Sequence, residues 1–415
     1  MSKDKEAYKG IPILGQLLAH IPQHIFDKVV LQTQSDKSHR TVSTWSQFVF
    51  LAYGIVTKSG TLRGTYKNLE LLGDKLCHLQ MKTIPARSSL SDANWNREAS
   101  VFGLLYLELY KYYQHYFSDS FVSRLVNGEI SLSDVEVFDS TTVSLFKDIF
   151  KNTGRLPENG KQKGGLKAFC KITLAERIPN FICLKAAATN EKVFLSLLDL
   201  AKGTIAVFDK GFQKFSQYAK WTEQGVFYVT RPNDNIKIKI IKNLHLEDVD
   251  DVGVVQDSII ELSYYDQKAK EHLTTESRMV AYIDPETNKK LVFITNHMGI
   301  KALTVCMLYQ RRWTIEPLFR QIKQNFELVY FMADSPEGIK AQIWIAMIMN
   351  LIFTVIHKKI KEAIDFATLV SIAANNMFSY VNFLGFAEDS SIVKREKDTN
   401  VGIVQLSLLN LIRGG

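Results

Sequence analysis

The sequence predicts an α/β protein with a mixed sheet flanked by helices, a helical N-terminal region and a β-rich insertion. Apolar residues recur at helical spacing through the first 125 residues. Two short apolar strands each end in an aspartate, and residues 231–300 alternate in polarity as strands do. Strands and helices follow one another without strict alternation, which favours a mixed sheet over a parallel one.

These patterns predict four domains. Residues 1–125 are expected to form a helical domain, and residues 126–230 with 301–385 a discontinuous domain of mixed strands and helices. Residues 231–300 form a β-strand insertion domain, and residues 386–415 form a C-terminal tail with a charged stretch.

The N-terminal region contains several helix signals. Thr44 begins a capping box before an apolar helix over 45–56, and Thr61 can cap the next helix. A turn over 84–92 leads into another capped helix, and a long amphipathic helix covers 100–116. Helix, tight turn and helix are compatible with docking in a DNA major groove, but an ordinary helical bundle gives the same pattern. Both interpretations stay open.

The middle of the chain predicts alternating short elements. Val135 to Asp139 alternates in polarity and is expected to be a strand. The other expected elements are a hairpin of 167–174 and 180–187, a helix over 191–201, a strand over 204–209, a helix over 215–224 and a strand over 226–230.

The insertion and the C-terminal region differ in character. Ile236, Ile238 and Ile240 alternate with lysines, which predicts a strand with one apolar and one basic face. Helices are expected over 304–328, 335–362 and 365–377. The apolar run Ile343–Ile356 is too short to span a bilayer and predicts a buried helix.

Composition narrows the class of protein. The 415 residues carry a net charge of +8, which favours a polyanionic partner such as nucleic acid. The four cysteines lack metal-site spacing, so free thiols in a reducing cytosol are expected. The polar start lacks the apolar core of a signal peptide. We therefore expect a cytoplasmic protein without a membrane span, associated with the nucleoid when bound to DNA.

Asp139 and Asp209 are the first candidates for chemistry. Each ends a short apolar strand, where a carboxylate is costly unless it is paired, hydrogen-bonded or bound to a metal. One such aspartate is more often a turn former or helix cap. Two in one domain, each followed by a loop suited to close approach, favour a site.

A third acidic residue lies in a helical stretch. Tyr309, Arg312, Glu316 and Lys323 are spaced by 3, 4 and 7 residues, which places them within about 60° of one helix face. A solvated charged face would give a similar pattern. Pro317 removes a helical N–H, so the helix is expected to kink or to begin near Glu316.

Three converging carboxylates require charge compensation. Mg²⁺ prefers oxygen ligands, and two such ions can activate the attacking oxygen and stabilise the leaving oxygen at phosphorus. The sequence therefore predicts a site in which Asp139, Asp209 and Glu316 hold two Mg²⁺ ions, for which Mn²⁺ can substitute.

Several motifs together resemble those of a known family. Val137–Thr142 and Phe208–Phe212 resemble its first- and second-aspartate motifs, and Gly165–Lys167 opens a hairpin as in relatives. The signature Tyr-x-x-Arg-x-x-x-Glu-x-x-x-x-x-x-Lys is present at every spacing, and residues 91–94 and 335–345 are also similar. On these residues the chain resembles the DDE transposases of bacterial insertion sequences, in the insertion-sequence-four family.

The resemblance implies a ribonuclease-H-like catalytic domain over 126–230 and 301–385, interrupted by the β domain, with residues 1–125 as the DNA-binding domain. It implies cut-and-paste transposition through a hairpin intermediate, acting on terminal inverted repeats and target DNA as a homodimer in the synaptic complex. It gives Tyr309, Arg312 and Lys323 the role of gripping phosphates near the cleaved end. Arg231 and Lys167 are further candidate DNA-binding residues.

The chain also departs from the family pattern. Relatives stack a flipped base on an aromatic residue of the insertion, often Trp, and residues 231–300 contain no Trp. Tyr264, Tyr265, Tyr282 or Phe293 could supply the ring. Phe169 stands where relatives have a histidine.

Two other functions remain as alternatives. A catalytically silent DNA-binding relic would not need the acidic and basic signature residues, which are all intact. A nuclease of the same fold without strand transfer would not need the β insertion or the helical N-terminal domain.

Glu136 is not expected to be a ligand, because it is an odd number of residues from Asp139 and faces the other side of the strand. The acidic residues within 247–251 are interpreted as a solvated turn.

Overall fold

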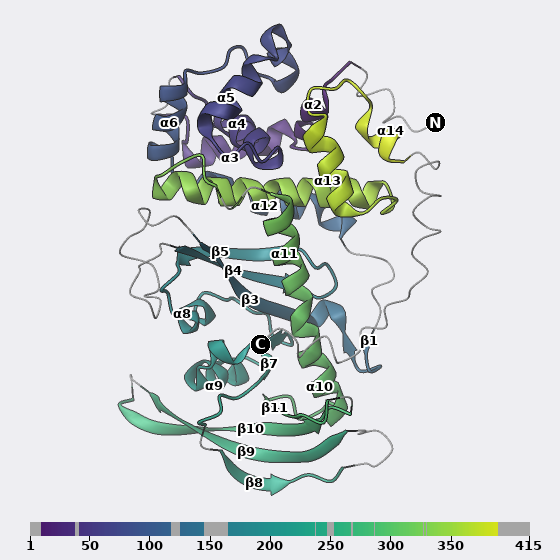
Figure 1. The fold of residues 1–415 in the computed structure, drawn as a ribbon. Coiled ribbons are helices and arrows are strands. Elements are labelled where there is room, and N and C mark those ends of the chain that lie inside the picture. Colours follow the sequence, from purple (N-terminus) through teal and green to yellow (C-terminus); the bar gives the residue numbers. More distant parts are fainter. Residues whose placement is uncertain are drawn as a thin grey trace. The chain divides into compact units, whose positions relative to one another are not determined.

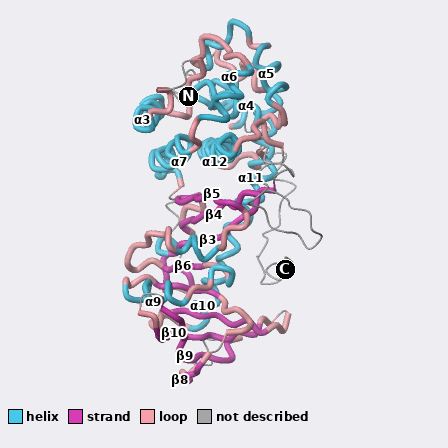
Figure 2. The backbone as a smooth tube through the Cα atoms, turned by 90° about the vertical axis from the view of Figure 1, so that its left-hand side faces the viewer, coloured by secondary structure: helices cyan, strands magenta, loops and turns pink. Residues whose placement is uncertain are grey.

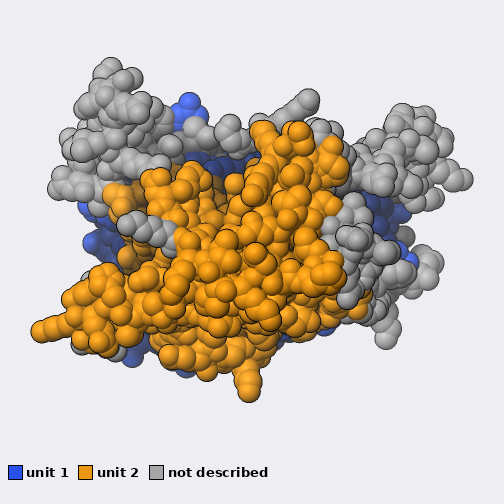
Figure 3. All heavy atoms as spheres, turned by 90° about the horizontal axis from the view of Figure 1, so that it is seen from below, with its two compact units in different colours: residues 1–117, 143–166, 319–403 blue, residues 118–142, 167–318, 404–415 orange. Residues whose placement is uncertain are grey.

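The computed structural model describes residues 10–37, 41–117, 125–144, 165–236, 238–246, 253–266, 269–285, 287–326, 328 and 330–388. The chain divides into two compact units, coloured separately in Figure 3. The first comprises Met1–Phe117, Val143–Leu166 and Phe319–Ile403, and the second comprises Ser118–Thr142, Lys167–Leu318 and Val404–Gly415. The acidic turn within 247–251 and the charged tail beyond residue 388 lie outside the described residues.

The first unit is helical. Its N-terminal helices are α2 Ile13–Leu18, α3 Gln23–Thr33, α4 Thr44–Val56, α5 Leu62–Glu70, α6 Arg87–Asn96 and α7 Ser100–Tyr113, with 3₁₀ turns at Gly73–Leu79 and Gln114–Tyr116. Its C-terminal helices are α12 Pro336–Lys359, α13 Phe366–Asn375 and α14 Phe383–Ala387. The helices predicted in both regions are present.

Helix α12 is the centre of this unit. It packs against α4, α6, α7 and α13, and Figure 1 shows it running beneath the N-terminal helices. Among the described residues it is the one helix long and apolar enough to cross a membrane, but 83% of its most apolar window is buried inside the protein. A helix that is apolar on all sides needs such burial. The prediction of a buried helix over Ile343–Ile356 is confirmed.

Most helix starts follow their predicted caps, with two corrections. The Thr61 side chain accepts a hydrogen bond from Gly64 N as predicted. Helix α4 is capped by Ser43, one residue before the expected Thr44, because the Thr44 hydroxyl is engaged by Asp36 at 2.7 Å. Helix α6 begins without a side-chain cap, so that predicted cap is wrong.

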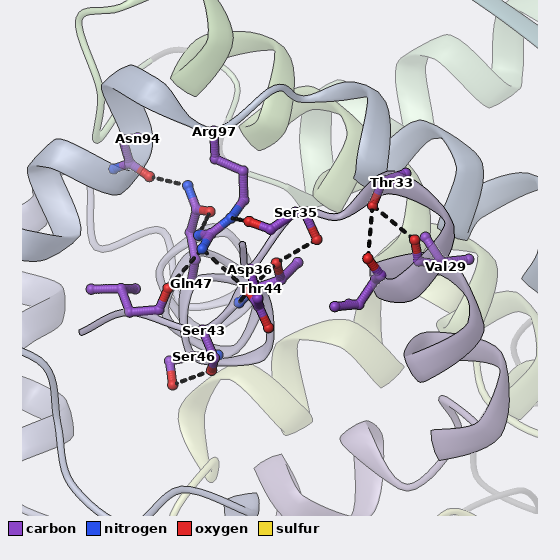
Figure 4. Close-up of polar contacts among 12 residues, drawn as sticks. Val29, Thr33, Ser35, Asp36, Ser43, Thr44, Ser46, Gln47, Asn94 and Arg97 are labelled. Carbon is purple, nitrogen blue, oxygen red and sulfur yellow. Dashed lines mark hydrogen bonds and ion pairs between the residues drawn. The ribbon is translucent and has the colours of Figure 1, made fainter. Parts of the chain in front are cut away.

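Arg97 joins several parts of the helical unit (Figure 4). Its guanidinium is 2% exposed and donates to the carbonyls of Val42 at 2.6 Å and Ser35 at 3.2 Å. It also contacts Asp36 at 3.4 Å and the side chain of Gln47. Burial lowers the pKa of Arg97 to about 10, and Asp36 opposes that shift. One cation therefore fixes the segment between α3 and α4.

The second unit is built on a nine-stranded sheet of order β5-β4-β3-β6-β7-β11-β10-β9-β8. Figure 2 shows the strands of this unit lying one after another from β5 to β8. Its strands are β3 Val135–Ser144, β4 Gly165–Thr173, β5 Pro179–Ala186, β6 Ile205–Val207, β7 Phe227–Thr230, β8 Lys239–Asn243, β9 Val254–Asp266, β10 Glu271–Ile283 and β11 Lys290–Thr295. A separate ribbon pairs β1 Leu125–Val126 with β2 Ile130–Ser131. The helical elements are η3 Leu132–Asp134, α8 Glu191–Leu195, η4 Lys210–Phe212, α9 Phe215–Glu223, α10 Ala302–Gln310, η5 Arg311–Thr314 and α11 Ile315–Asn325, whose last residues enter the first unit.

The sheet is mixed, as the sequence predicts. Strand β6 pairs in parallel with both β3 and β7, whereas β7, β11, β10, β9 and β8 pair antiparallel in that order. The β-rich insertion is therefore continuous with the core sheet, since backbone hydrogen bonds join β11 to β7.

The compact units differ from the predicted domain ranges in two ways. The predicted insertion domain belongs to the same unit as the core strands, because they share one sheet. The helices after residue 319 belong to the first unit, because they pack with the N-terminal helices. Two smaller predictions are also corrected: α8 ends at Leu195 rather than at 201, and Ile240 is 47% exposed although Ile236 and Ile238 pack against the core.

Helices α9 and α10 cover opposite faces of the sheet. Ile294 of β11 lies in the same buried cluster as Tyr218 and Trp221 of α9. The preceding residue, Phe293, packs against Tyr309 of α10 with ring centroids 5.0 Å apart. Successive residues of a strand point to opposite faces, so the sheet is covered on both sides.

Candidate active site

The strand register places Asp139 and Asp209 side by side. Val135 pairs with Ile205 and Val137 with Val207 in parallel strands. Each aspartate lies two residues beyond the last of these pairs. Asp209 follows the end of β6, whereas Asp139 lies within β3, because the β-branched residues after it continue that strand to Ser144. The prediction that a strand ends at Asp139 is therefore wrong. The convergence predicted from the sequence is therefore a consequence of the β3–β6 pairing.

An aromatic core supports this edge of the sheet. The residues immediately before the two aspartates, Phe138 and Phe208, are fully buried and stack with ring centroids 4.7 Å apart. Phe212 of η4 packs edge-on against Phe138 at 5.3 Å. Side chains this closely packed leave little freedom for the backbone that carries the carboxylates.

The third carboxylate is carried by a broken helix. Tyr309 lies near the end of α10, Arg312 lies in the 3₁₀ turn η5, and Glu316 lies in the first turn of α11. Pro317 is the third residue of α11, where its missing N–H removes no helical hydrogen bond. The prediction that the helix would begin again near Glu316 is confirmed.

Arg312 joins two of the three carboxylates. Its Nη1 lies 2.9 Å from Asp139 Oδ2, and its Nη2 lies 3.5 Å from Glu316 Oε1. The Arg312 residue is 7% exposed and its guanidinium lies 4.9 Å from the centroid of the Trp313 ring. Burial lowers the pKa of Arg312, but Tyr309, Asp139 and the other carboxylates outweigh it, and the net shift is upward. The side chain therefore stays cationic.

Tyr309 contacts the remaining carboxylate. Its hydroxyl donates to Asp209 Oδ1 at 3.2 Å. Burial raises the pKa of Tyr309 well above its usual value, and Asp209 adds to the shift. Arg231 acts in the opposite direction on the same pKa, which places it within electrostatic reach of Tyr309. Tyr309 and Arg312 thus contact the two aspartates directly, and Arg231 acts on Tyr309 through its charge.

The carboxyl of Asp139 has a raised pKa. Burial raises its pKa to about 6, although Arg312 and a 2.7 Å hydrogen bond from Ser140 N lower it. Asp209 and Glu316 raise it further, as like charges do. Both other carboxylates therefore act on the pKa of Asp139.

The donor set fits a hard divalent cation only in part. Three carboxylates supply the oxygen ligands that Mg²⁺ prefers. Within the described residues, however, no three His, Cys, Asp or Glu side chains lie close enough to hold a metal ion together. The expected joint coordination is therefore not observed. Arg312 lies between Asp139 and Glu316, so its guanidinium must move before their oxygens can share an ion.

Two other candidate DNA-binding residues have different surroundings. Lys323 is exposed on α11, seven residues after Glu316, and partial burial lowers its pKa. Lys167 is 4% exposed, and its Nζ donates to Glu191 Oε1 at 3.2 Å and to Thr189 O at 3.3 Å. The amine of this candidate DNA-binding residue is therefore buried and paired with a carboxylate.

The aromatic candidates for base stacking are reduced by burial. Phe293 is 2% exposed and Tyr282 is 6% exposed, so neither ring is open to a base. Tyr265 is 53% exposed near the end of β9, and the adjacent Tyr264 is partly exposed. Phe169 is 1% exposed and stacks on Phe194 at 4.8 Å, which explains its apolar character.

Two other acidic residues, Glu136 and Glu191, have different partners. Glu136 forms an ion pair with Lys171 at 2.6 Å and takes no part in the contacts of Asp139, as expected. Glu191 was not anticipated: its Oε1 accepts from Ser140 Oγ at 3.0 Å. The signal available in the sequence is weak, since an acidic residue in the first turn of a helix after Asn190 is an ordinary helix start.

A family model described as the transposase DDE domain matches residues 131–352, which is more than half of the chain. The chain belongs to the DDE transposase family. Asp139, Asp209 and Glu316 all fall within the matched region. Residues 9–82 match a second family model, described as a domain of unknown function.

Similar proteins carry related names. A proposed transposase of Sinorhizobium fredii is 25% identical over 64% of this chain and 69% of its own length. A proposed transposase for an insertion-sequence element of Synechocystis is 23% identical over 74% of this chain and 80% of its own length. These matches are compatible with the insertion-sequence-four family.

One solved structure is similar only at a low level. A piggyBac transposase in a synaptic complex with hairpin DNA has 8% identity and a TM-score of 0.36, covering 98% of this chain and 84% of that chain. A TM-score of this size supports no conclusion about the present fold.

Family membership defines the general activity. The protein is a bacterial insertion-sequence DNA transposase, an enzyme that cleaves DNA and transfers strands. DDE transposase domains generally use divalent metal ions, typically Mg²⁺.

Proposed function

We propose that Asp139, Asp209 and Glu316 are the catalytic carboxylates of this transposase and that they act with two Mg²⁺ ions. The observation that carries the proposal is the position of Arg312, whose guanidinium contacts both Asp139 and Glu316. Asp139 of β3 and Arg312 of the α10–α11 region are 173 positions apart in the sequence, and this contact brings them together. The contact of Tyr309 with Asp209 adds the third acid to the same group.

The chemistry proposed for the site follows from this charge arrangement. Bound divalent ions would activate the attacking oxygen and stabilise the leaving oxygen in a displacement at phosphorus. Asp139, Asp209 and Glu316, which are partly buried, would hold those ions. Arg312, Tyr309 and Lys323 would bind phosphates beside the reacting bond.

We extend the proposal to the wider reaction. Cleavage would occur at the terminal inverted repeats, followed by strand transfer into target DNA, with two copies of the chain in the synaptic complex. The parallel β3–β6–β7 pairing and the helices on both faces support a ribonuclease-H-like core. For a hairpin intermediate, Tyr265 is the most exposed of the four candidate aromatic residues and would stack the flipped base.

The test uses a DNA fragment that carries the reading frame with its own flanking sequences. Asp139→Ala, Asp209→Ala and Glu316→Ala should each abolish Mg²⁺-dependent cleavage of this fragment while a mobility-shift assay still detects binding. Asp199→Ala is the matched control, because Asp199 is an exposed aspartate of the same unit. Cleavage by any of the three variants at the rate of the control would refute the assignment of that residue.

A further inference from the structure

Glu191 connects the segments that follow both proposed catalytic aspartates, in β3 after Asp139 and in η4 after Asp209. Its Oε1 accepts a hydrogen bond at 3.0 Å from Ser140, the residue after Asp139. Its Oε2 lies directly over Gly211, two residues after Asp209, so closely that a Cβ at Gly211 would overlap the carboxylate. A single side chain therefore touches the chain on both sides of the acidic pair.

The helix that carries Glu191 is fixed by the core. Helix α8 begins after Asn190, whose side chain accepts from Lys192 N at 3.0 Å. Phe194, three residues after Glu191, is 1% exposed and packs between the rings of Phe169 and Phe138 at 4.8 and 5.9 Å. Because this anchor is rigid, the carboxylate of Glu191 is held in one place rather than free on a loop.

The charge of Glu191 is balanced from inside the protein. Lys167 Nζ lies 3.2 Å from the same Oε1, and the lysine side chain is 5% exposed. A buried ammonium without a partner is strongly unfavourable, so the pair constrains both side chains. Lys167 therefore serves as the counter-ion of Glu191, a role different from the DNA binding expected from the sequence.

We propose that Glu191 is a positioning residue that sets the separation of Asp139 and Asp209, with Lys167 as its internal counter-ion and Gly211 as the small residue that makes room for its carboxylate. The inference rests on the proposed function, because it assumes that these two aspartates act together. Loss of Glu191 frees Ser140 and Gly211, and a displacement of about 1 Å at a catalytic group can lower a rate by roughly 100-fold.

The test is a double-mutant cycle between Glu191→Ala and Gly211→Ala in the full chain. The probe is the fragment with the flanking DNA, and kcat, KM and the Mg²⁺ concentration for half-maximal cleavage are measured. Each single variant should lower kcat roughly 10- to 100-fold and raise the Mg²⁺ requirement, with KM for DNA unchanged. Gly211→Ala should have little further effect once Glu191 is alanine, because the side chain it displaces is gone.

Controls separate the outcomes. Lys192→Ala alters an exposed residue of the same helix and should behave as the parent. Glu191→Gln keeps an acceptor for Ser140. It replaces Glu191→Ala in the double-mutant cycle if circular dichroism shows that Glu191→Ala does not fold. Additive effects of the two substitutions, or an unchanged Mg²⁺ requirement in both singles, would overturn the inference while leaving the catalytic assignment intact. If the parent and Asp139→Ala cleave equally, the proposed function fails and the positioning role fails with it.

Discussion

Replacing Arg312 with Met should destabilise the protein at neutral pH in metal-free buffer. Methionine retains much of the apolar stem but removes the charge that faces Asp139 at 2.9 Å and Glu316 at 3.5 Å. Breaking a fully buried ion pair costs about 3–5 kcal/mol, because the remaining charge is left without a partner. The Asp139 and Glu316 side chains are 17% and 32% exposed, so solvent reduces the expected loss to about 2–3 kcal/mol.

The loss should depend on pH in a defined direction. The pKa of Asp139 is raised to about 6, so at pH 5 this carboxyl is mostly protonated and the ion pair contributes little in the parent. At pH 8 the carboxylate is ionised, and removing Arg312 leaves it facing two other acids. The difference in unfolding free energy between parent and variant should therefore increase from pH 5 to pH 8.

The assay is urea unfolding monitored by circular dichroism in the presence of a chelator. Arg311→Met is the matched control, because Arg311 is the exposed neighbour in the same 3₁₀ turn. Added Mg²⁺ should recover more stability in Arg312→Met than in the parent, since another cation then faces the carboxylates. A loss no larger than that of Arg311→Met, or one equal at both pH values, would show that Arg312 does not compensate these charges.

Three further predictions follow from other contacts. The unfolding free energy of the parent relative to Asp139→Asn, measured in chelator, should fall by up to about 3 kcal/mol as pH rises from about 4 through 6. The reason is that the folded state holds the carboxyl proton of Asp139 more tightly than the unfolded state, and a pH-independent difference would contradict the raised pKa. Lys323→Ala should weaken binding of end DNA and reduce the slope of log affinity against log salt by about 1 in a mobility-shift titration, and an unchanged slope would remove its phosphate role. Arg97→Met should lower the unfolding free energy by about 3 kcal/mol, because the carbonyls of Val42 and Ser35 lose their donor; urea unfolding within about 0.5 kcal/mol of the parent would show that the buried guanidinium is dispensable.

The local pattern was sufficient to place the two aspartates. The two apolar runs before Asp139 and Asp209 predict the strands β3 and β6, and the parallel pairing of these strands then aligns the two aspartates. The strand ends were not predicted, since β3 continues to Ser144 and β6 ends at Val207. Pro317 likewise predicts a helix start near Glu316 because its effect on the backbone is local. Features fixed by one residue's own backbone chemistry can be inferred from the sequence.

Features that depend on a distant partner could not be inferred in this way. Lys167 looks like a surface cation in a hairpin, and only the folded chain brings Glu191 to its amine. Thr44 looks like the helix cap, but Asp36 takes its hydroxyl and Ser43 caps instead. The domain ranges differ for the same reason, because an apolar helix such as α12 predicts burial without naming the helices that will bury it.

The position of Arg312 has a consequence for how DNA can be bound. The family resemblance assigns this residue to phosphate binding, whereas here its two terminal nitrogens face Asp139 and Glu316. Its Nε is buried without a partner among the described residues, so one donor stays uncommitted to the acids. A guanidinium cannot leave two carboxylates in a poorly solvated site unless another cation takes over its charge. We therefore expect phosphate binding by Arg312 to require divalent metal, so that removing metal weakens end binding in the parent more than in Arg312→Met.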